Sequence, residues 1–224
     1  PQGLRRLAGL CHRVLHLAPP PSDTGNLWHT DPRTQALTRV LALRTPPKVL
    51  VYGSTSGVYG DCAGGFVRET QALSPQTPRA MRRQAAEASV RAFGKQTGVP
   101  WVILRIPGIY AVDREGGTPV ERLRKGTPVL AAADDVYTNH IQADDLARAC
   151  VLALWRGGRQ RSINVNDDTD LKMGDYFDLA ADIYGLPRPQ RLPRSTAQAQ
   201  LPLVLLSFMS ESRRMCNDRM KSEL

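Results

Sequence analysis

A short apolar run that ends in a string of glycine, serine and threonine constrains the fold of this chain more than any other feature. The sequence VLVYGSTSGVYGD covers residues 49–61. Val49 to Tyr52 form a run too short for a helix and rich in β-branched residues, which predicts a buried strand. Residues 53–57 then place small hydroxyl side chains at the carboxyl end of that strand, where open α/β sheets bind ligands. This segment therefore predicts the floor of a ligand site.

Strand and helix signals alternate along most of the chain. Strands are expected at residues 13–18, 49–52, 101–106 and 162–166, and helices at 79–96, 144–155 and 173–184. A further helix opens at Asp31-Pro32 and stops before Pro46. In the helix at 79–96, the apolar side chains that recur with a helical period are Met81, Ala85, Ala88 and Ala92. This alternation predicts an α/β fold with a mostly parallel sheet and helices on both of its faces.

Composition excludes several classes of protein. The chain carries a formal net charge of +9 over 224 residues, but its arginines are scattered and aromatic residues make up only 6% of it. Because a nucleic-acid binder gathers basic residues and interleaves them with aromatic ones, no nucleic-acid partner is expected. No apolar run is long enough to cross a membrane. The four cysteines lie far apart, which fits neither a zinc knuckle nor a disulfide framework and favours a cytoplasmic location. The histidines show no metal-ligand spacing, so no metal site is expected.

Four blocks of sequence share a pattern of residue types and a fixed order. They are VLHLAPP at 14–20, YGSTSGVYGD at 52–61, ILRIPGIY at 103–110 and TNHIQADDLARA at 138–149. Together they resemble the extended short-chain dehydrogenases/reductases, the NAD-dependent epimerase/dehydratase family. The segments DDVYTNHI and LLSFMSESRR are similar to its atypical YeeZ-like branch. The resemblance implies a Rossmann-type sheet, NAD or NADP as the cofactor, and hydride transfer on a small polar substrate such as a nucleotide-linked sugar.

The start of the chain departs from this family. The family begins with a strand and a G-x-x-G-x-x-G turn that cradles the cofactor diphosphate, and this sequence contains no such turn. The resemblance therefore implies an N-terminally truncated fragment that lacks the first βαβ half of the sheet and binds NAD(P) poorly by itself. Residues 1–111 are expected to be the C-terminal portion of the Rossmann domain. Residues 112–224 are expected to form a small substrate-side lobe, interleaved with the last Rossmann elements near 162–166.

A second departure from the family lies in the helix at 79–96. The family uses Tyr-x-x-x-Lys, in which the lysine lowers the pKa of the tyrosine and the tyrosine moves a proton while hydride moves to or from the nicotinamide. Alignment on Ala86-Glu87 puts Arg79 and Arg83 at these positions. Arginine stays charged, so Arg79 cannot do what the tyrosine does. Arg83 can still hold ribose or phosphate oxygens. Arg79, Arg82 and Arg83 form a basic cluster that is either a phosphate or carboxylate clamp or a solvated helix face.

Candidate catalytic residues also lie at the end of the strand at 49–52. Thr55 and Ser56 match the family's Ser/Thr that hydrogen-bonds a substrate oxygen, and the alternative is local capping of the turn. Tyr59 is a candidate for the missing acid, and the alternative is that its ring packs the loop under the sheet. Together with Arg79 and Arg83, these residues are the catalytic candidates.

The resemblance also implies contacts to the cofactor and to the substrate. The cofactor-binding candidates are Ala18, Pro19, Ser54, Arg83, Pro107, Gly108 and Ile109. His140 is interpreted as structural. Arg213 and Arg214 resemble basic residues of the family's nucleotide-sugar pocket, but the weak match favours a solvated terminal helix.

These observations favour a NAD(P)-dependent epimerase/dehydratase-like oxidoreductase. The alternative is a non-catalytic NAD(P)-binding sensor or scaffold on the same fold, because the Tyr-x-x-x-Lys pair is absent. The expected partner is a small-molecule substrate, with no nucleic acid and no membrane. The sequence allows for a homodimer.

Overall fold

A four-stranded parallel sheet forms the centre of the computed structural model, which describes residues 3–21 and 28–224. Its strands run in the order β1, β2, β4, β9, with β2 and β4 in the middle. Their bounds are β1 Val14–His16, β2 Leu50–Thr55, β4 Trp101–Ile106 and β9 Arg161–Asn164. The predicted mostly parallel α/β sheet is confirmed, and β2 extends past the apolar run into Ser54 and Thr55.

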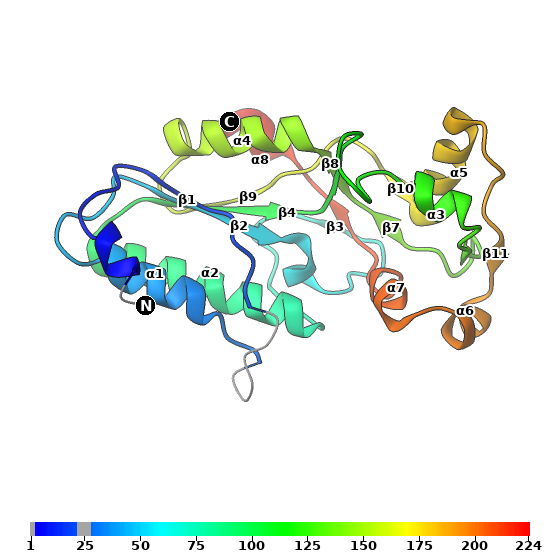
Figure 1. Cartoon of the computed structure of the whole chain (residues 1–224), viewed down its shortest axis with the longest axis horizontal. Coiled ribbons are helices and arrows are strands. Elements are labelled where there is room, and N and C mark those ends of the chain that lie inside the picture. Colours follow the sequence, from blue (N-terminus) through cyan, green and yellow to red (C-terminus); the bar gives the residue numbers. More distant parts are fainter. Residues whose placement is uncertain (1–2, 22–27) are drawn as a thin grey trace.

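Helices cover both faces of this sheet, as predicted (Figure 1). Helices α1 Pro32–Leu41 and α2 Pro78–Thr97 lie on one face, and α4 Ala143–Trp155 and α8 Asp218–Glu223 lie on the other. Successive side chains of β2 point to opposite faces of the sheet and pack into the hydrophobic core on each face. Leu50 and Tyr52 pack with α1 and α2, whereas Val51 packs with α4. Within the described residues, no helix is both long and apolar enough to span a membrane.

The helix boundaries follow local signals. The Asp31 carboxylate accepts hydrogen bonds from the backbone N–H groups of Arg33 and Thr34 at 3.0 and 3.1 Å, which caps α1 as predicted. The Thr77 hydroxyl caps α2 in the same way, by accepting from the Ala80 N–H at 3.2 Å. Gly185 ends α5 Met173–Tyr184 with φ of +62°, a conformation that favours glycine.

The apolar side chains that recur with a helical period do not mark the buried face of α2. Ala88 and Ala92 are exposed, and Met81 and Ala85 are only half-buried. The helix is instead rotated so that its buried residues are Ala80, Ala86, Glu87, Val90, Phe93 and Gly94. The recurring alanines misled the prediction because the true buried face contains a charged residue, whose burial depends on a partner in a distant strand.

A second, smaller lobe lies beside the carboxyl edge of the sheet (Figure 1). Its own core includes Leu130, Val136, Met173, Phe177 and Leu192. The division into residues 1–111 and 112–224 stays a prediction. The remaining elements are η1 Leu4–Leu7, η3 Ser56–Tyr59, β3 Phe66–Val67, β5 Gly108–Tyr110, α3 Val120–Arg124, β6 Val129–Leu130, β7 Tyr137–Thr138, β8 His140–Gln142, β10 Leu171–Lys172, β11 Arg191–Leu192, α6 Arg194–Gln200, α7 Leu203–Phe208 and β12 Arg214–Met215.

Short strands occur where the sequence predicted only loops. β3 lies between the strand expected at 49–52 and the helix expected at 79–96 and pairs with β12, and β5 follows Pro107 and pairs with β8. Both partners are distant in the sequence, so the local pattern of two or three residues gave no strand signal. These pairs join the lobe to the sheet.

A buried ion pair joins α2 to the centre of the sheet. The Arg105 guanidinium on β4 donates to both carboxylate oxygens of Glu87, through Nε at 3.2 Å and Nη2 at 2.9 Å. The Ser54 hydroxyl on β2 donates to the same carboxylate at 2.7 Å. The two charged side chains are 2% and 1% exposed. Burial opposes the charged form of Arg105, but the hydrogen bonds and charge of Glu87 raise its pKa above the ordinary value.

The same guanidinium continues into a polar network under the turn that follows β2. Arg105 Nη1 donates to the Tyr59 hydroxyl at 2.9 Å and to the Glu69 carbonyl at 3.1 Å. The Tyr59 hydroxyl donates in turn to Asn164 Oδ1 at 2.6 Å. One arginine therefore connects α2, β4, η3 and the end of β9.

Replacing Glu87 with glutamine tests how much this ion pair contributes to the free energy of unfolding. The E87Q variant leaves the buried Arg105 charge without its counter-ion, so we expect the free energy of unfolding to fall by about 3–5 kcal/mol. Urea denaturation followed by circular dichroism measures the change. The exposed Glu121→Gln is the matched control, expected within about 0.5 kcal/mol of the wild type. A loss for E87Q no larger than that of the control would contradict this account of the ion pair.

A buried histidine on β1 makes the stability depend on pH. His16 Nε2 lies 2.8 Å from Thr34 Oγ1, and because the Thr34 hydroxyl donates to Asp31 at 2.6 Å, the histidine must be the donor in its pair. Burial lowers the pKa of His16 below 6.5, although the Asp31 charge opposes this shift. The unfolded state therefore binds more protons near pH 6 than the folded state does.

We expect the free energy of unfolding to fall as the pH is lowered from about 7.5 through 6.5, because protonated His16 is accommodated better in the unfolded chain. Urea denaturation over this pH range measures the slope. The His16→Gln variant should show a smaller slope, and the exposed His12→Gln should keep the wild-type slope. An unchanged slope in H16Q would show that other groups cause the dependence.

Candidate active site

A cleft of about 690 Å³ opens between the carboxyl edge of the sheet and the small lobe. Its sheet side comes from the ends of β2 and β4, which are hydrogen-bonded neighbours, and from the first turn of α2. Its lobe side is lined by residues from the segments 114–122, 137–140, 173–177 and 207–213. The cleft therefore lies where the sequence predicted a ligand site.

Most of the predicted site residues line this one cleft. They are Ser54, Thr55, Ser56, Arg79, Arg83, Pro107, Gly108 and Ile109. Ala18, Pro19 and Tyr59 are not part of the lining, although Leu17, next to Ala18, is.

Thr55 and Ser56 present hydroxyl groups at the end of β2. Thr55 Oγ1 accepts from the Gly57 N–H at 3.3 Å, so this residue both caps the turn and lines the cleft. Ser54 is different, because its hydroxyl is bound to Glu87. The Ser56 hydroxyl makes no hydrogen bond within the described part of the chain, and it remains available to a ligand oxygen.

Arg83 and Arg79 lie one turn apart on α2 and differ in their partners. Arg83 Nη1 donates to the Gly53 carbonyl at 2.7 Å and to the Tyr52 hydroxyl at 3.1 Å, which holds the guanidinium against the end of β2. Arg79 is exposed, and its guanidinium carbon lies 5.2 Å from the centre of the Phe208 ring on α7. Its side chain makes no hydrogen bond to any residue that the structure describes. Burial raises the pKa of Tyr52 to about 12, so this tyrosine is no substitute acid.

Tyr59 packs beneath the turn. It is 1% exposed, and its hydroxyl is engaged by Arg105 and Asn164. Burial raises the pKa of Tyr59, although Arg105 opposes the shift. A buried phenol with two hydrogen-bond partners and a raised pKa is poorly placed to exchange a proton with a ligand in the cleft. These contacts favour the packing role that the sequence offered as the alternative.

The lobe side of the cleft carries buried polar atoms without a partner among the described residues. They are Arg122 Nε and Nη2, Thr138 Oγ1, His140 Nδ1, Glu211 Oε1 and Arg213 Nε. Buried polar atoms are normally hydrogen-bonded, so such a concentration in one cleft is a signature of a ligand site. Local sequence gave no signal for Arg122, which lies on the five-residue helix α3, or for Glu211, which lies in an irregular segment.

The interpretation of Arg213 as part of a solvated terminal helix is wrong. Arg213 precedes β12 and is 9% exposed. Both of its Nη atoms donate to Glu211 Oε2 at 2.8 Å, and Nη1 also donates to the Gly60 carbonyl at 2.6 Å. The resemblance to basic pocket residues was the signal that could have placed it in the cleft.

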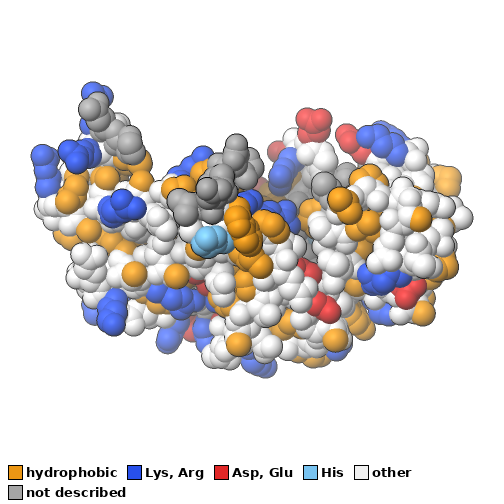
Figure 2. All heavy atoms as spheres, turned by 90° about the horizontal axis from the view of Figure 1, so that it is seen from below, with side chains coloured by type: hydrophobic (Ala, Val, Ile, Leu, Met, Phe, Trp, Pro, Cys, Tyr) orange, Lys and Arg blue, Asp and Glu red, His pale blue; other side chains and the backbone are white. Residues whose placement is uncertain are grey.

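The cleft is strongly cationic. Its described lining residues include five arginines and a single carboxylate, that of Glu211. Over the α1–α2 face of the molecule, by contrast, lysines and arginines are spread out rather than gathered (Figure 2). In the part of the chain that the structure describes, no cluster of three or more His, Cys, Asp or Glu could hold a metal ion. The cleft therefore favours an anionic organic ligand.

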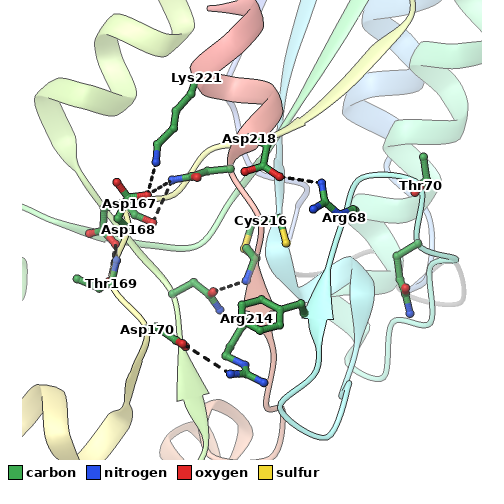
Figure 3. A pocket seen from close by; sticks show the side chains of 15 residues that line it. Arg68, Thr70, Asp167, Asp168, Thr169, Asp170, Arg214, Cys216, Asp218 and Lys221 are labelled. Atoms are coloured by element: carbon green, nitrogen blue, oxygen red, sulfur yellow. Dashed lines mark hydrogen bonds and ion pairs between the residues drawn. The ribbon is translucent and has the colours of Figure 1, made fainter.

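A second hollow, of about 670 Å³, lies beside the β3–β12 pair and differs in its charge balance (Figure 3). Each of its cations faces a carboxylate of the same hollow. The pairs are Arg68–Asp218 at 2.8 Å, Lys221–Asp168 at 2.6 Å and Arg214–Asp170 at 3.6 Å. These pairs leave no cation of the hollow for a ligand to neutralise.

Comparison with known proteins identifies the family. The model of the NAD dependent epimerase/dehydratase family matches residues 26–166, which is more than half of the chain. This chain belongs to that family. The predicted resemblance is thereby confirmed, and the family is NAD-dependent by description. Assignment to the YeeZ-like branch stays a prediction.

Relatives of this epimerase/dehydratase family member support the fold. A functionally unknown conserved protein from Silicibacter pomeroyi DSS superimposes with a TM-score of 0.80 at 30% identity, over 97% of this chain and 72% of the other. UDP-glucuronic acid 4-epimerase from Bacillus cereus, solved in complex with NAD, gives 0.74 at 19% identity over 99% and 70%. The uncharacterized UDP-glucose epimerase YtcB of Bacillus subtilis (strain 168) is 32% identical over 119 residues, half of this chain. That match covers 37% of the length of YtcB.

Replacing Tyr59 with phenylalanine separates its packing role from a role in the chemistry. The Y59F variant leaves Asn164 Oδ1 buried without its donor, so we expect a loss of about 1–3 kcal/mol in the free energy of unfolding. Ligand affinity of the cleft should not change. The half-exposed Tyr184→Phe is the control for stability. A Y59F variant that keeps its stability but loses turnover or ligand binding would restore the acid role.

Proposed function

We propose that this chain is part of a NAD(P)-dependent oxidoreductase of the epimerase/dehydratase kind, which acts by hydride transfer on a small polar substrate, a nucleotide-linked sugar. The observation that carries the proposal is the cationic cleft at the carboxyl edge of the parallel sheet, with five arginines against one carboxylate. A dinucleotide and a nucleotide sugar are both anionic, and each combines phosphates with hydroxyls. UDP-sugar epimerases among the relatives support this substrate class.

The cleft fits the nicotinamide–ribose half of such a cofactor. Pro107, Gly108 and Ile109 form one apolar wall, and Gly108 has no side chain, so its backbone can approach a ring closely. Arg83, already held by the Gly53 carbonyl, can bind ribose hydroxyls with its remaining N–H groups. When bound, the cofactor supplies the hydride donor or acceptor. The glycine turn expected to hold its diphosphate is not part of this sequence.

The chain's own residues orient the substrate. The Ser56 hydroxyl and the hydroxyl proton of Thr55 can hold a substrate carbonyl or hydroxyl beside the Pro107–Ile109 wall. Arg79 occupies the position of the family's tyrosine, and its permanent charge lets it stabilise negative charge on an oxygen but not exchange a proton. A cytoplasmic location, suggested by four free cysteines, and a homodimer remain parts of the proposal.

A second candidate function is favoured by Arg79 itself. Without an acid or base at this position, the same cleft would bind NAD(P) and an anionic ligand without turnover, as a sensor or scaffold. The two functions share the cleft and differ only in the proton-transfer step.

Restoring the missing pair separates the two candidates. NAD(P)H oxidation and epimer formation are measured with a panel of UDP-sugars for the wild type and for the Arg79→Tyr/Arg83→Lys double variant. Isothermal titration calorimetry measures the affinity for NAD, NADP and each sugar.

Turnover by the wild type supports the enzyme. Binding without turnover, together with a gain of turnover in the double variant, supports the sensor, because restoring the tyrosine and lysine is then enough to start proton transfer. Failure of the wild type to bind NAD, NADP and every UDP-sugar would contradict both. The Arg82→Lys variant is a control for the helix surface, since Arg82 does not line the cleft.

A further inference from the structure

Arg122, on the lobe side of the cleft, is held in place without a counter-ion. Its guanidinium carbon lies 4.3 Å from the centre of the Phe177 ring, which stacks the group between α3 and α5. No salt bridge or side-chain hydrogen bond of Arg122 occurs within the described residues. Burial without a compensating carboxylate lowers the pKa of this guanidinium.

The orphaned atoms of Arg122 form one edge of the guanidinium. Nε and Nη2 are both buried and both without a partner. These two donors point in the same direction and together make the fork that binds two oxygens of a carboxylate or phosphate. In Arg105 the same edge is filled, because Nε and Nη2 donate to the two oxygens of Glu87. The Nε/Nη2 edge of Arg122 therefore lacks the two acceptor oxygens that Glu87 supplies to Arg105.

The one buried arginine among the described residues of the lobe side is neutralised. Arg213 has its charge matched by Glu211, at 2.8 Å. Arg83, on the sheet side, is engaged by a carbonyl and a phenol. Arg122 is half-buried, its Nε and Nη2 atoms are fully buried, and it has neither a carboxylate nor a hydrogen-bond acceptor within the part of the chain described.

Buried guanidinium donors without an acceptor are costly, so their presence in a ligand cleft calls for a compensating group from the ligand. We propose that the Nε/Nη2 edge of Arg122, stacked on Phe177, binds an oxyanion of the substrate and makes this cleft selective for acidic over neutral ligands. The oxyanion is a phosphate or a carboxylate, which share this bidentate geometry. The inference rests on the proposed function, since it assigns the acidic end of the same ligand.

The test compares Arg122→Gln with Arg124→Gln. Both variants remove one positive charge. Arg124 lies on the same short helix but is exposed and does not line the cleft, so R124Q controls for the loss of charge alone. The probes are uridine diphosphate, glucuronate and neutral glucose, each titrated calorimetrically into the full chain. We expect R122Q to weaken the binding of one anionic probe by about 10- to 100-fold, as for a lost charged hydrogen-bond pair, and R124Q to change it by less than about twofold.

The two anions distinguish the source of the oxyanion. A loss confined to uridine diphosphate assigns a phosphate to Arg122, and a loss confined to glucuronate assigns a carboxylate. Equal affinities of R122Q and the wild type would overturn the inference while leaving the proposed function intact. A wild type that binds neither anion would overturn it as well. Failure of the proposed function is separate, since it requires that NAD, NADP and every UDP-sugar fail to bind.

A second variant keeps the test decisive if R122Q is hard to interpret. Arg122→Met keeps the apolar stem on Phe177 and removes the charge. If Arg122 is held for a ligand, the unliganded R122M protein should melt at the same or a higher temperature than the wild type, and the anion should no longer raise its melting temperature. A lower melting temperature with undiminished stabilisation by the anion would show that Arg122 serves packing alone.

Discussion

The buried pair of Glu87 and Arg105 is the interaction on which the rest of the structure depends. It fixes α2 against the middle strands of the sheet, and through Ser54 and Tyr59 it also fixes the turn that follows β2. A buried ion pair tolerates no missing partner, because the remaining charge would be left in a medium of low polarity. The position of the cleft follows from this constraint, since the first turn of α2 and the end of β2 form its sheet side.

The arginines of this basic chain fall into two groups: those paired within the protein and those with unpaired donors in the cleft. Arg105 is structural, because each of its three guanidinium nitrogens donates to a group of the protein. Arg122 is equally fixed, by Phe177, but its bidentate edge is empty. The cations of the second hollow, beside β3 and β12, are paired within the protein like Arg105, because each one faces a carboxylate. The cleft differs from this hollow, because its five arginines face a single carboxylate, and this excess of positive charge favours an anionic ligand.

Much of the fold could be predicted from the sequence because its signals are local. Asp31-Pro32 and Gly185 mark helix ends through their own backbone chemistry, and the apolar run before Gly53 marks a strand. The buried face of α2 could not be predicted, because Glu87 is buried only by virtue of Arg105, 18 residues away. By contrast, the sheet-side residues of the cleft could be predicted, because they lie at the ends of β2 and β4 and in the first turns of α2. Its lobe side is assembled from short segments far apart in the sequence, and Arg122 lies on a helix of only five residues, so it carried no local signal. Arg213 was interpreted as solvent-exposed, because its partner Glu211 lies in an irregular segment that gave no signal of burial.

Hydrogen–deuterium exchange of the full chain, with and without saturating NAD and uridine diphosphate, tests most directly whether the cationic cleft is the ligand site. The account predicts slower exchange in residues 53–57, 106–110, 118–122 and 207–213, which line both sides of the cleft. Residues 66–71, 167–170 and 214–221, around the second hollow, should exchange as in the unliganded protein. Protection confined to the second hollow, or none in the cleft at ligand concentrations that saturate binding, would contradict the account.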